Sequence, residues 1–138
     1  MTWLLYAFVS AFASALTAIL AKLGVEGVPS TLATAIRTVV ILVVVWMIVF
    51  ALHEQRALPV LSRRSVIFLV LSGLSTGVAW FAYFRALQLG PASRVAPIDK
   101  LSLPLTIILA VIWLGEPIGW RVATGVGLMT LGALLTLT

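Results

Sequence analysis

Three charged side chains stand inside long apolar stretches of the sequence, and they are the residues best suited to bind a polar solute or to gate its passage. They are Arg37, Asp99 and Lys100. A guanidinium or ammonium group recognises carboxylates and phosphates, and a carboxylate accepts hydrogen bonds from either cation. Each charge at the centre of a membrane helix costs about 2.5–3.5 kcal/mol on insertion scales. A charge in such a place therefore needs a compensating partner or serves a function.

The positions of these charges allow a functional and a structural interpretation. Each lies a few residues from the start of its apolar stretch, at a shared depth of about 7–10 Å for a helix that rises 1.5 Å per residue. Because adjacent residues cannot share a helix face, an Arg37–Asp99 pair is possible and would leave Lys100 for a substrate. Alternatively, both cations snorkel to the interface and Asp99 only neutralises one of them. The structural role is preferred for Arg37, and both roles stay open for Asp99 and Lys100.

Weakly polar side chains form two stripes at helical spacing. One stripe holds Tyr6, Ser10, Ser14 and Thr17, and the other holds Ser72, Thr76, Trp80 and Tyr83. Such stripes can line a water-filled path, but small residues also let helices pack closely, and packing is the preferred interpretation for the serines and threonines. Trp80 lies well inside its stretch, whereas belt tryptophans lie near the ends. We keep Trp80, Tyr83, Ser10 and Ser14 as candidates to line a substrate path.

Two prolines lie beside the Asp99–Lys100 pair in the fourth apolar stretch. Pro97 cannot donate to the carbonyl of Ser93, and Pro104 cannot donate to that of Lys100. Free carbonyls beside charged groups are typical of the broken helices in transporters. A kink that only serves packing is the alternative.

Glycines at helical spacing predict close contacts between helices. Gly73 and Gly77 form a small-xxx-small pattern, which marks a contact within a subunit or between subunits. Gly125 and Gly132 lie on one face of the last stretch. The sequence does not distinguish an internal contact from a contact between two subunits.

The composition requires a membrane environment. The chain has 138 residues, of which 62% are hydrophobic and 9% charged, and its mean hydropathy is +1.21. A soluble domain carries roughly 25% charged residues, so the polar surface here is too small to cover a globule. Apolar stretches of about 18 residues or more can span a bilayer as helices. The sequence predicts one all-α integral membrane domain, 1–138, with transmembrane helices at about 2–22, 31–52, 66–87, 94–114 and 118–138, and a polar loop at 53–65.

Several kinds of chemistry find no support in the sequence. The chain has no cysteine, so disulfides and thiolate metal sites are excluded, and the residues next to its single histidine do not supply a metal-binding cluster. No nucleophile–base constellation or phosphate-binding loop is present. The net charge of +5 falls mostly between apolar stretches, where anionic lipid headgroups explain it better than nucleic acid. We expect neither an enzyme nor a bound cofactor, and no nucleic-acid partner.

The basic residues between the apolar stretches give only a small preference for one orientation of the chain in the membrane. Five spans would put the two termini on opposite sides of the membrane. The N-terminal side then collects four arginines and the other side three basic residues. The basic second loop favours a cytoplasmic N-terminus under the positive-inside rule. The near tie also permits insertion in both orientations, which would allow an antiparallel homodimer.

Nearly the whole sequence resembles an EamA-type domain of the drug/metabolite transporter superfamily, and the recognisable pattern lies in the third to fifth apolar stretches. The resemblance rests on GVAWFAYFRAL at 77–87, ASRVAPIDKL at 92–101, Pro104, LGE at 114–116 and the glycines of the last stretch. Arg37 also falls where such domains often carry arginine. Most members of the superfamily hold two five-helix domains, and this sequence resembles the half-length members, which pair. The related small multidrug resistance proteins carry a glutamate in their first helix, which is absent here.

The resemblance implies a transporter of a small metabolite in the cell (inner) membrane, and it names no substrate. We expect a secondary transporter that works as a homodimer, or as a pair with a homologous half, by alternating access. The excess of cations among the buried charges slightly favours a substrate with a carboxylate. Two alternatives stay open: a component of a flippase for a lipid-linked substrate, and a non-transporting scaffold or accessory subunit.

Overall fold

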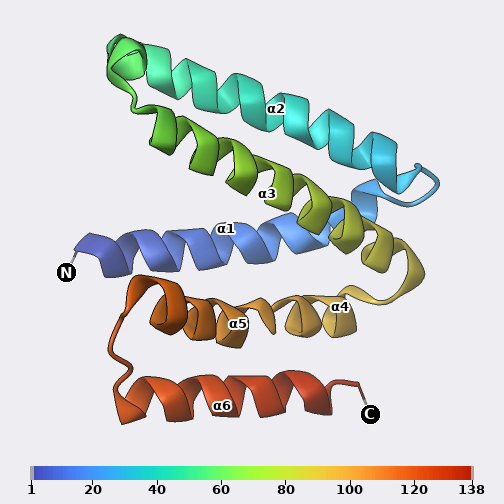
Figure 1. The fold of residues 1–138 in the computed structure, drawn as a ribbon. Coiled ribbons are helices and arrows are strands. Elements are labelled where there is room, and N and C mark those ends of the chain that lie inside the picture. The colour runs from blue at the N-terminus through green and yellow to red at the C-terminus, as the bar shows by residue number, and fades with distance from the viewer. Residues whose placement is uncertain (1, 138) are drawn as a thin grey trace. The chain divides into compact units, whose positions relative to one another are not determined.

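The computed structural model describes residues 2–137 and is built from helices, with no strand in that range. Met1, the first residue of the predicted domain, and Thr138, the last residue of the predicted helix at 118–138, lie outside the described residues. The helices, shown in Figure 1, are α1 (Thr2–Gly24), α2 (Ser30–Ala51), the 3-10 helix η1 (Glu54–Val60), α3 (Arg63–Leu89), α4 (Ala92–Asp99), α5 (Ser102–Leu109), the π-helix η2 (Ala110–Leu114) and α6 (Trp120–Leu135). The predicted all-α class is confirmed.

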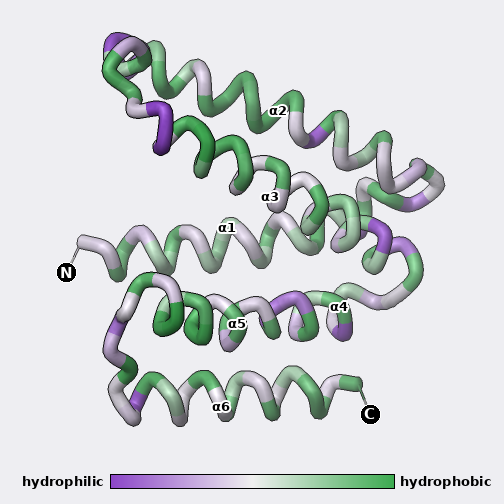
Figure 2. Tube along the Cα trace, in the orientation of Figure 1, coloured by the Kyte–Doolittle hydropathy of each residue, from purple (hydrophilic) through white to green (hydrophobic). Residues whose placement is uncertain are grey.

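Four segments are long and apolar enough to cross a membrane. They are α1, α2, α3 and the combined segment Ala92–Leu114. Figure 2 shows hydrophobic colour on most turns of α2. The last helix, α6, has 16 residues and so measures about 24 Å, which is less than the roughly 30 Å of a hydrocarbon core. The predicted count of five spanning helices is therefore not confirmed, although the multi-pass membrane architecture is.

The predicted polar loop at 53–65 is wrong for most of its length, because residues 54–60 lie in η1 and residues 63–65 in α3. His53 turns the chain with a φ of 58°, and η1 follows it at once. Ser62 caps the start of α3, which begins at Arg63, because its Oγ accepts a hydrogen bond from the amide of Ser65 at 3.0 Å. A serine in this position satisfies one of the free amides of a helix start. Arg63 and Arg64 consequently lie in the first turn of a helix and not in a loop.

The chain forms two compact units, which are described separately. Unit 1 comprises Met1–Ile19 and Leu89–Thr138, and unit 2 comprises Leu20–Gln88. In unit 1, α6 packs against α4 and α5, and Ala133 of α6 is buried. In unit 2, α2 and α3 run antiparallel, joined through η1 (Figure 1).

The tightest packing in unit 2 lies where the chain leaves α1, turns into α2 and meets the end of α3. Leu87 of α3 has no exposed surface, and Phe84 is 3% exposed. Ala21 and Val25 come from the end of α1 and the turn after it, and both are buried. This apolar cluster fixes the end of α3 against the α1–α2 turn.

Side chains satisfy the backbone carbonyls at this end of unit 2. Lys22 Nζ donates to the carbonyl of Leu87 at 2.6 Å, within the last turn of α3. The amide of Gln88 donates to the carbonyls of Val25 and Val28 in the α1–α2 turn. The last carbonyls of a helix have no partner inside it, and a cation near them also complements the helix dipole. These bonds therefore tie two helix ends together and neutralise their polarity.

Truncation of Leu87 tests this cluster. Leu87→Ala should lower the free energy of unfolding by about 2–3 kcal/mol, near the low end of the usual range, because lipid is as apolar as the lost side chain. Leu89→Ala, two residues away at a position that is 75% exposed, should change it by less than about 0.5 kcal/mol. Unfolding of the detergent-solubilised protein, followed by circular dichroism, measures both. Equal effects of the two substitutions would show that the cluster does not hold the end of α3.

Candidate functional site

The centre of the candidate site is a stack of Arg37 on Trp80 inside unit 2. The guanidinium carbon of Arg37 lies 3.4 Å from the centre of the Trp80 ring. Arg37 stands seven residues after the start of α2, about 10 Å along the helix, and Trp80 stands nine residues before the end of α3. Because the two helices run antiparallel, these positions meet. The sequence predicted both residues separately and did not predict that they touch.

Three aromatic residues of α3 build the wall on which the arginine rests. Trp80, Tyr83 and Phe84 stand at i, i+3 and i+4, so they share one helix face. The ring centres of Trp80 and Tyr83 are 5.6 Å apart with the planes at 84°, and those of Trp80 and Phe84 are 6.0 Å apart. Phe84 belongs to the buried cluster and also lies 5.8 Å from the Arg37 guanidinium. The packed end of unit 2 therefore supports the platform that orients Arg37.

No acid of unit 2 forms an ion pair with Arg37. The two acids of this unit, Glu26 and Glu54, lie outside α2, one before its start and one after its end. A cation over a tryptophan face gains about 2 kcal/mol or more when it is desolvated, against an insertion cost of about 2.5–3.5 kcal/mol. Stacking uses the face of the guanidinium and leaves the N–H donors at its edge directed outward in its plane. The half-buried Arg37 is therefore compensated only in part, and it can donate to an anion.

Asp99 and Lys100 meet each other in unit 1. Lys100 Nζ lies 3.4 Å from Asp99 Oδ2, and the two side chains are 55% and 44% exposed. The expectation that these neighbours point to different faces is thus wrong, whereas a substrate contact of Lys100 stays a prediction. The reason is local: α4 ends at Asp99, and Lys100 follows it in a turn with a ψ of −6°. Arg37 belongs to unit 2, so its pairing with Asp99 stays a prediction.

The fourth apolar stretch is interrupted here, although it was predicted as one helix over 94–114. The interruption between α4 and α5 is a tight helical turn, in which the amide of Lys100 donates to Pro97 and that of Leu101 to Ile98. The carbonyl of Lys100, which Pro104 cannot serve, accepts from the amide of Leu103 at 3.0 Å. The predicted free carbonyl at Lys100 is therefore wrong. The bonds at this turn join residues three apart, as in a 3-10 helix, and they keep the carbonyl of Lys100 paired.

The remaining polar candidates lie on open helix faces. Ser10 and Ser14 are exposed on α1. The hydroxyls of Thr17 and Thr76 donate to carbonyls one turn earlier in their own helices, at 2.8 and 2.9 Å. Their hydrogen-bonding capacity is thus partly used by the backbone. Tyr83 is half-buried beside Trp80 and stays within reach of the Arg37 stack.

The four glycine candidates have no neighbouring helix close to them within their own units. A Cβ added at Gly73 or Gly77 would meet nothing in unit 2 within 4 Å, and the same holds for Gly125 and Gly132 in unit 1. The predicted internal helix contact at these glycines is absent from each unit. A contact with a second subunit stays a prediction.

Sequence inspection missed Phe84 and the cluster behind it. The aromatic residues at i, i+3 and i+4 opposite an in-membrane arginine were the available signal, but only the pairing of α2 with α3 turns that signal into a site. Among residues 2–137, no three histidine, aspartate or glutamate side chains converge to hold a metal ion.

The long apolar helices and the cation held between two of them define a multi-pass membrane protein. Comparison with known proteins gives its family: the EamA-like transporter family matches the chain over residues 1–138. A protein of Sinorhizobium sp. named "Uncharacterized transporter in cobO 3'region" is 48% identical over 134 residues, which cover 97% of this chain and 95% of that protein. No solved structure matches the chain. The chain belongs to the EamA-like transporter family and is a membrane transporter.

A double-mutant cycle measures the Arg37–Trp80 stack. The pair Arg37→Met and Trp80→Leu should show a coupling free energy of about 1–2 kcal/mol in detergent unfolding experiments, because the stack is close and half-buried. The matched control is Arg64→Met with Phe68→Leu, an exposed pair 5.8 Å apart, which should couple by about 0.5 kcal/mol or less. Equal coupling in the two cycles would remove the stack as an organising contact.

Proposed function

We propose that the protein is a secondary transporter of a small polar metabolite that carries a carboxylate, and that it works as a dimer by alternating access. The observation that carries the proposal is the Arg37 guanidinium, held flat on Trp80 without an acidic partner in unit 2. A planar guanidinium binds a carboxylate through two parallel hydrogen bonds. Trp80 and Tyr83 would contact the apolar part of the same substrate.

The Asp99–Lys100 pair is proposed to act in gating. The pair is loose at 3.4 Å and half-exposed, so its net stabilisation is small in a wet environment and larger when water is excluded. It stands at the proline-induced turn of Ala92–Leu114, where α4 and α5 meet. A rocking motion that changes the wetting of this turn would change the strength of the pair.

Two features support a dimer. The Sinorhizobium relative named as a transporter aligns over 95% of its own length, so it holds one such domain. The faces that carry Gly73, Gly77, Gly125 and Gly132 are open within their units, which suits close contact with a second copy. We place the assembly in the cell (inner) membrane. Subunits of opposite orientation would reproduce the inverted repeats of many transporters. A parallel assembly would have every N-terminus on one side, for which the basic loop after the second span favours the cytoplasm.

Ligand-induced stabilisation tests the carboxylate proposal. The purified protein is heated with a panel of small metabolites, each offered as the carboxylate and as its uncharged amide. At least one carboxylate should raise the Tm while its amide does not. Arg37→Gln should weaken that ligand by about 10- to 100-fold, as expected for the loss of a hydrogen bond between charged groups. Arg37→Lys should lose less, because it keeps the charge and loses only the bidentate geometry.

Arg121→Gln is the matched control, since Arg121 is an exposed arginine at the start of α6 and takes no part in the stack. It should leave the affinity unchanged. Stabilisation by amides and carboxylates alike, or equal affinity in the Arg37→Gln and wild-type proteins, would refute the carboxylate site.

The absence of cysteine allows a direct test of the antiparallel assembly. Glu26→Cys and Glu116→Cys place single thiols in the α1–α2 turn and in the segment before α6, which the helix count puts on opposite surfaces. Dual insertion predicts that an impermeant thiol reagent labels about half of each variant on intact cells. A single orientation predicts full labelling of one variant and none of the other, and would exclude the antiparallel homodimer.

A further inference from the structure

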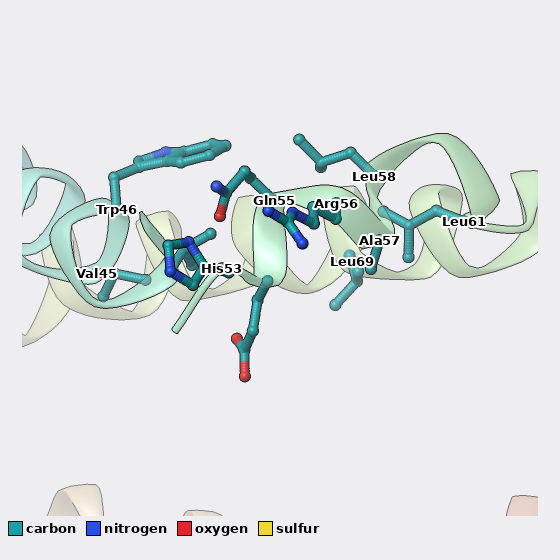
Figure 3. A pocket seen from close by; sticks show the side chains of 11 residues that line it. Val45, Trp46, His53, Gln55, Arg56, Ala57, Leu58, Leu61 and Leu69 are labelled. Carbon is teal, nitrogen blue, oxygen red and sulfur yellow. The ribbon is translucent and has the colours of Figure 1, made fainter. Parts of the chain in front are cut away.

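An open groove lies in unit 2 where α2 ends, η1 crosses and α3 begins. Its volume is about 1010 Å³. We call it the corner groove. Its lining is Val45, Trp46, Val49, His53, Glu54, Gln55, Arg56, Ala57, Leu58, Leu61 and Leu69. Figure 3 shows Gln55 and Arg56 in the middle of this lining, with Trp46 and Val45 to one side and Leu58 and Leu61 to the other. The candidate transport site lies towards the opposite ends of α2 and α3.

The corner groove stands at the level of a bilayer surface. Both helices that frame it are long and apolar enough to span the membrane, α2 ending at Ala51 and α3 beginning at Arg63. The segment between them nevertheless exposes apolar side chains, including Leu58 at 52% and Val60 at 85%. Such exposure is unfavourable in water and is satisfied among lipid chains at the interface.

The charge around the groove is positive. Arg56 belongs to the lining, and Arg63 and Arg64 follow in the first turn of α3, all three exposed. The acid of this corner is Glu54. Three arginines against one glutamate disfavour a ligand with its own cationic group and favour a phosphate, which guanidinium groups bind well.

One buried acceptor in the groove lacks a donor. Gln55 Oε1 has no solvent contact and accepts no hydrogen bond from residues 2–137. A buried polar atom left without a partner costs roughly 1–3 kcal/mol. A turn of the Gln55 side chain towards the groove would expose this oxygen, and a ligand with a hydroxyl beside its phosphate would then supply the missing donor.

We infer that the corner groove is a binding site for one anionic phospholipid with a hydroxyl-bearing headgroup. The phosphate lies against Arg56, and an acyl chain follows the apolar lining at Val45, Val49 and Leu69. The Gln55 side chain turns towards the groove on binding, and its Oε1 then accepts a hydrogen bond from a headgroup hydroxyl. Free phosphate would use the arginine and leave the apolar lining empty. A zwitterionic lipid would bring its ammonium group towards the arginines and lack the hydroxyl. Charge, apolar lining and membrane level thus point to the same occupant.

Native mass spectrometry of the detergent-solubilised chain tests the site. The probes are phosphatidylglycerol and phosphatidylcholine with identical acyl chains, each titrated separately. The wild-type protein should retain one phosphatidylglycerol with at least about fivefold higher affinity than phosphatidylcholine, the preference expected from one arginine near an anionic headgroup. Arg56→Gln should remove most of that preference. Arg121→Gln, an exposed arginine outside the groove, should keep it.

A second measurement uses the wild-type protein and so does not depend on the folding of a variant. Phosphatidylglycerol with a photoactivatable acyl chain should cross-link chiefly to the peptides that hold Val45–Val49 and Leu69. Equal retention of the two lipids, loss of binding in the presence of equimolar inorganic phosphate, or cross-links spread evenly over α1, α2 and α3 would each overturn the inference.

Discussion

The hydrocarbon interior of a bilayer offers no hydrogen-bond partners, and the rest of this structure follows from that constraint. Every backbone amide and carbonyl inside it must be satisfied by the chain, which is why the described residues form helices. The constraint also explains the details at the helix ends. Lys22 reaches the carbonyl of Leu87, and Gln88 reaches two carbonyls of the α1–α2 turn. Even where Pro104 removes a donor, the amide of Leu103 takes its place.

The charged side chains inside the apolar stretches are stabilised in two different ways, by an ion pair and by stacking on an aromatic ring. Asp99 and Lys100 neutralise each other within one turn, so the pair needs no outside ion. Arg37 is treated differently, since an aromatic face supports it and unit 2 supplies no anion. Stacking stabilises the cation less than an ion pair would, and it leaves the N–H donors at the edge of the guanidinium able to bind an anion. A cation kept in this state is suited to an anion that binds and leaves, because a permanent carboxylate partner would compete with the substrate.

The sequence was sufficient for the all-helical membrane class, and it named Arg37, Trp80 and Tyr83 as candidates, but it did not predict the number of spanning helices or the contact between Arg37 and Trp80. Apolar length and composition predict helices directly, because the bilayer leaves no other solution for such stretches. The helix boundaries depend on local hydrogen bonds. Ser62 caps the start of α3, so the helix begins at Arg63 and includes Arg63 and Arg64, whose polarity had indicated a loop. The last helix, α6, is shorter than a membrane span. The stack of Arg37 on Trp80 could not be predicted, since it depends on how far α2 slides along α3. That register is set by Leu87 and Phe84, whose burial has no signature in a uniformly apolar sequence.

Uneven packing along unit 2 has a mechanical consequence. One end is held by the Phe84–Leu87 cluster and by side-chain bonds to carbonyls, whereas α2 and α3 expose most of their apolar surface towards their other ends. Lipid or a neighbouring subunit can cover that surface with little free-energy difference, because both are apolar. A motion that replaces lipid contacts by subunit contacts would therefore change the free energy little at the open end. At the packed end the same motion would break protein contacts and would be unfavourable. The Arg37 stack stands beside the packed end, so its geometry would persist while the rest of the helix pair moves, which is what the proposed alternating access requires of the proposed carboxylate site.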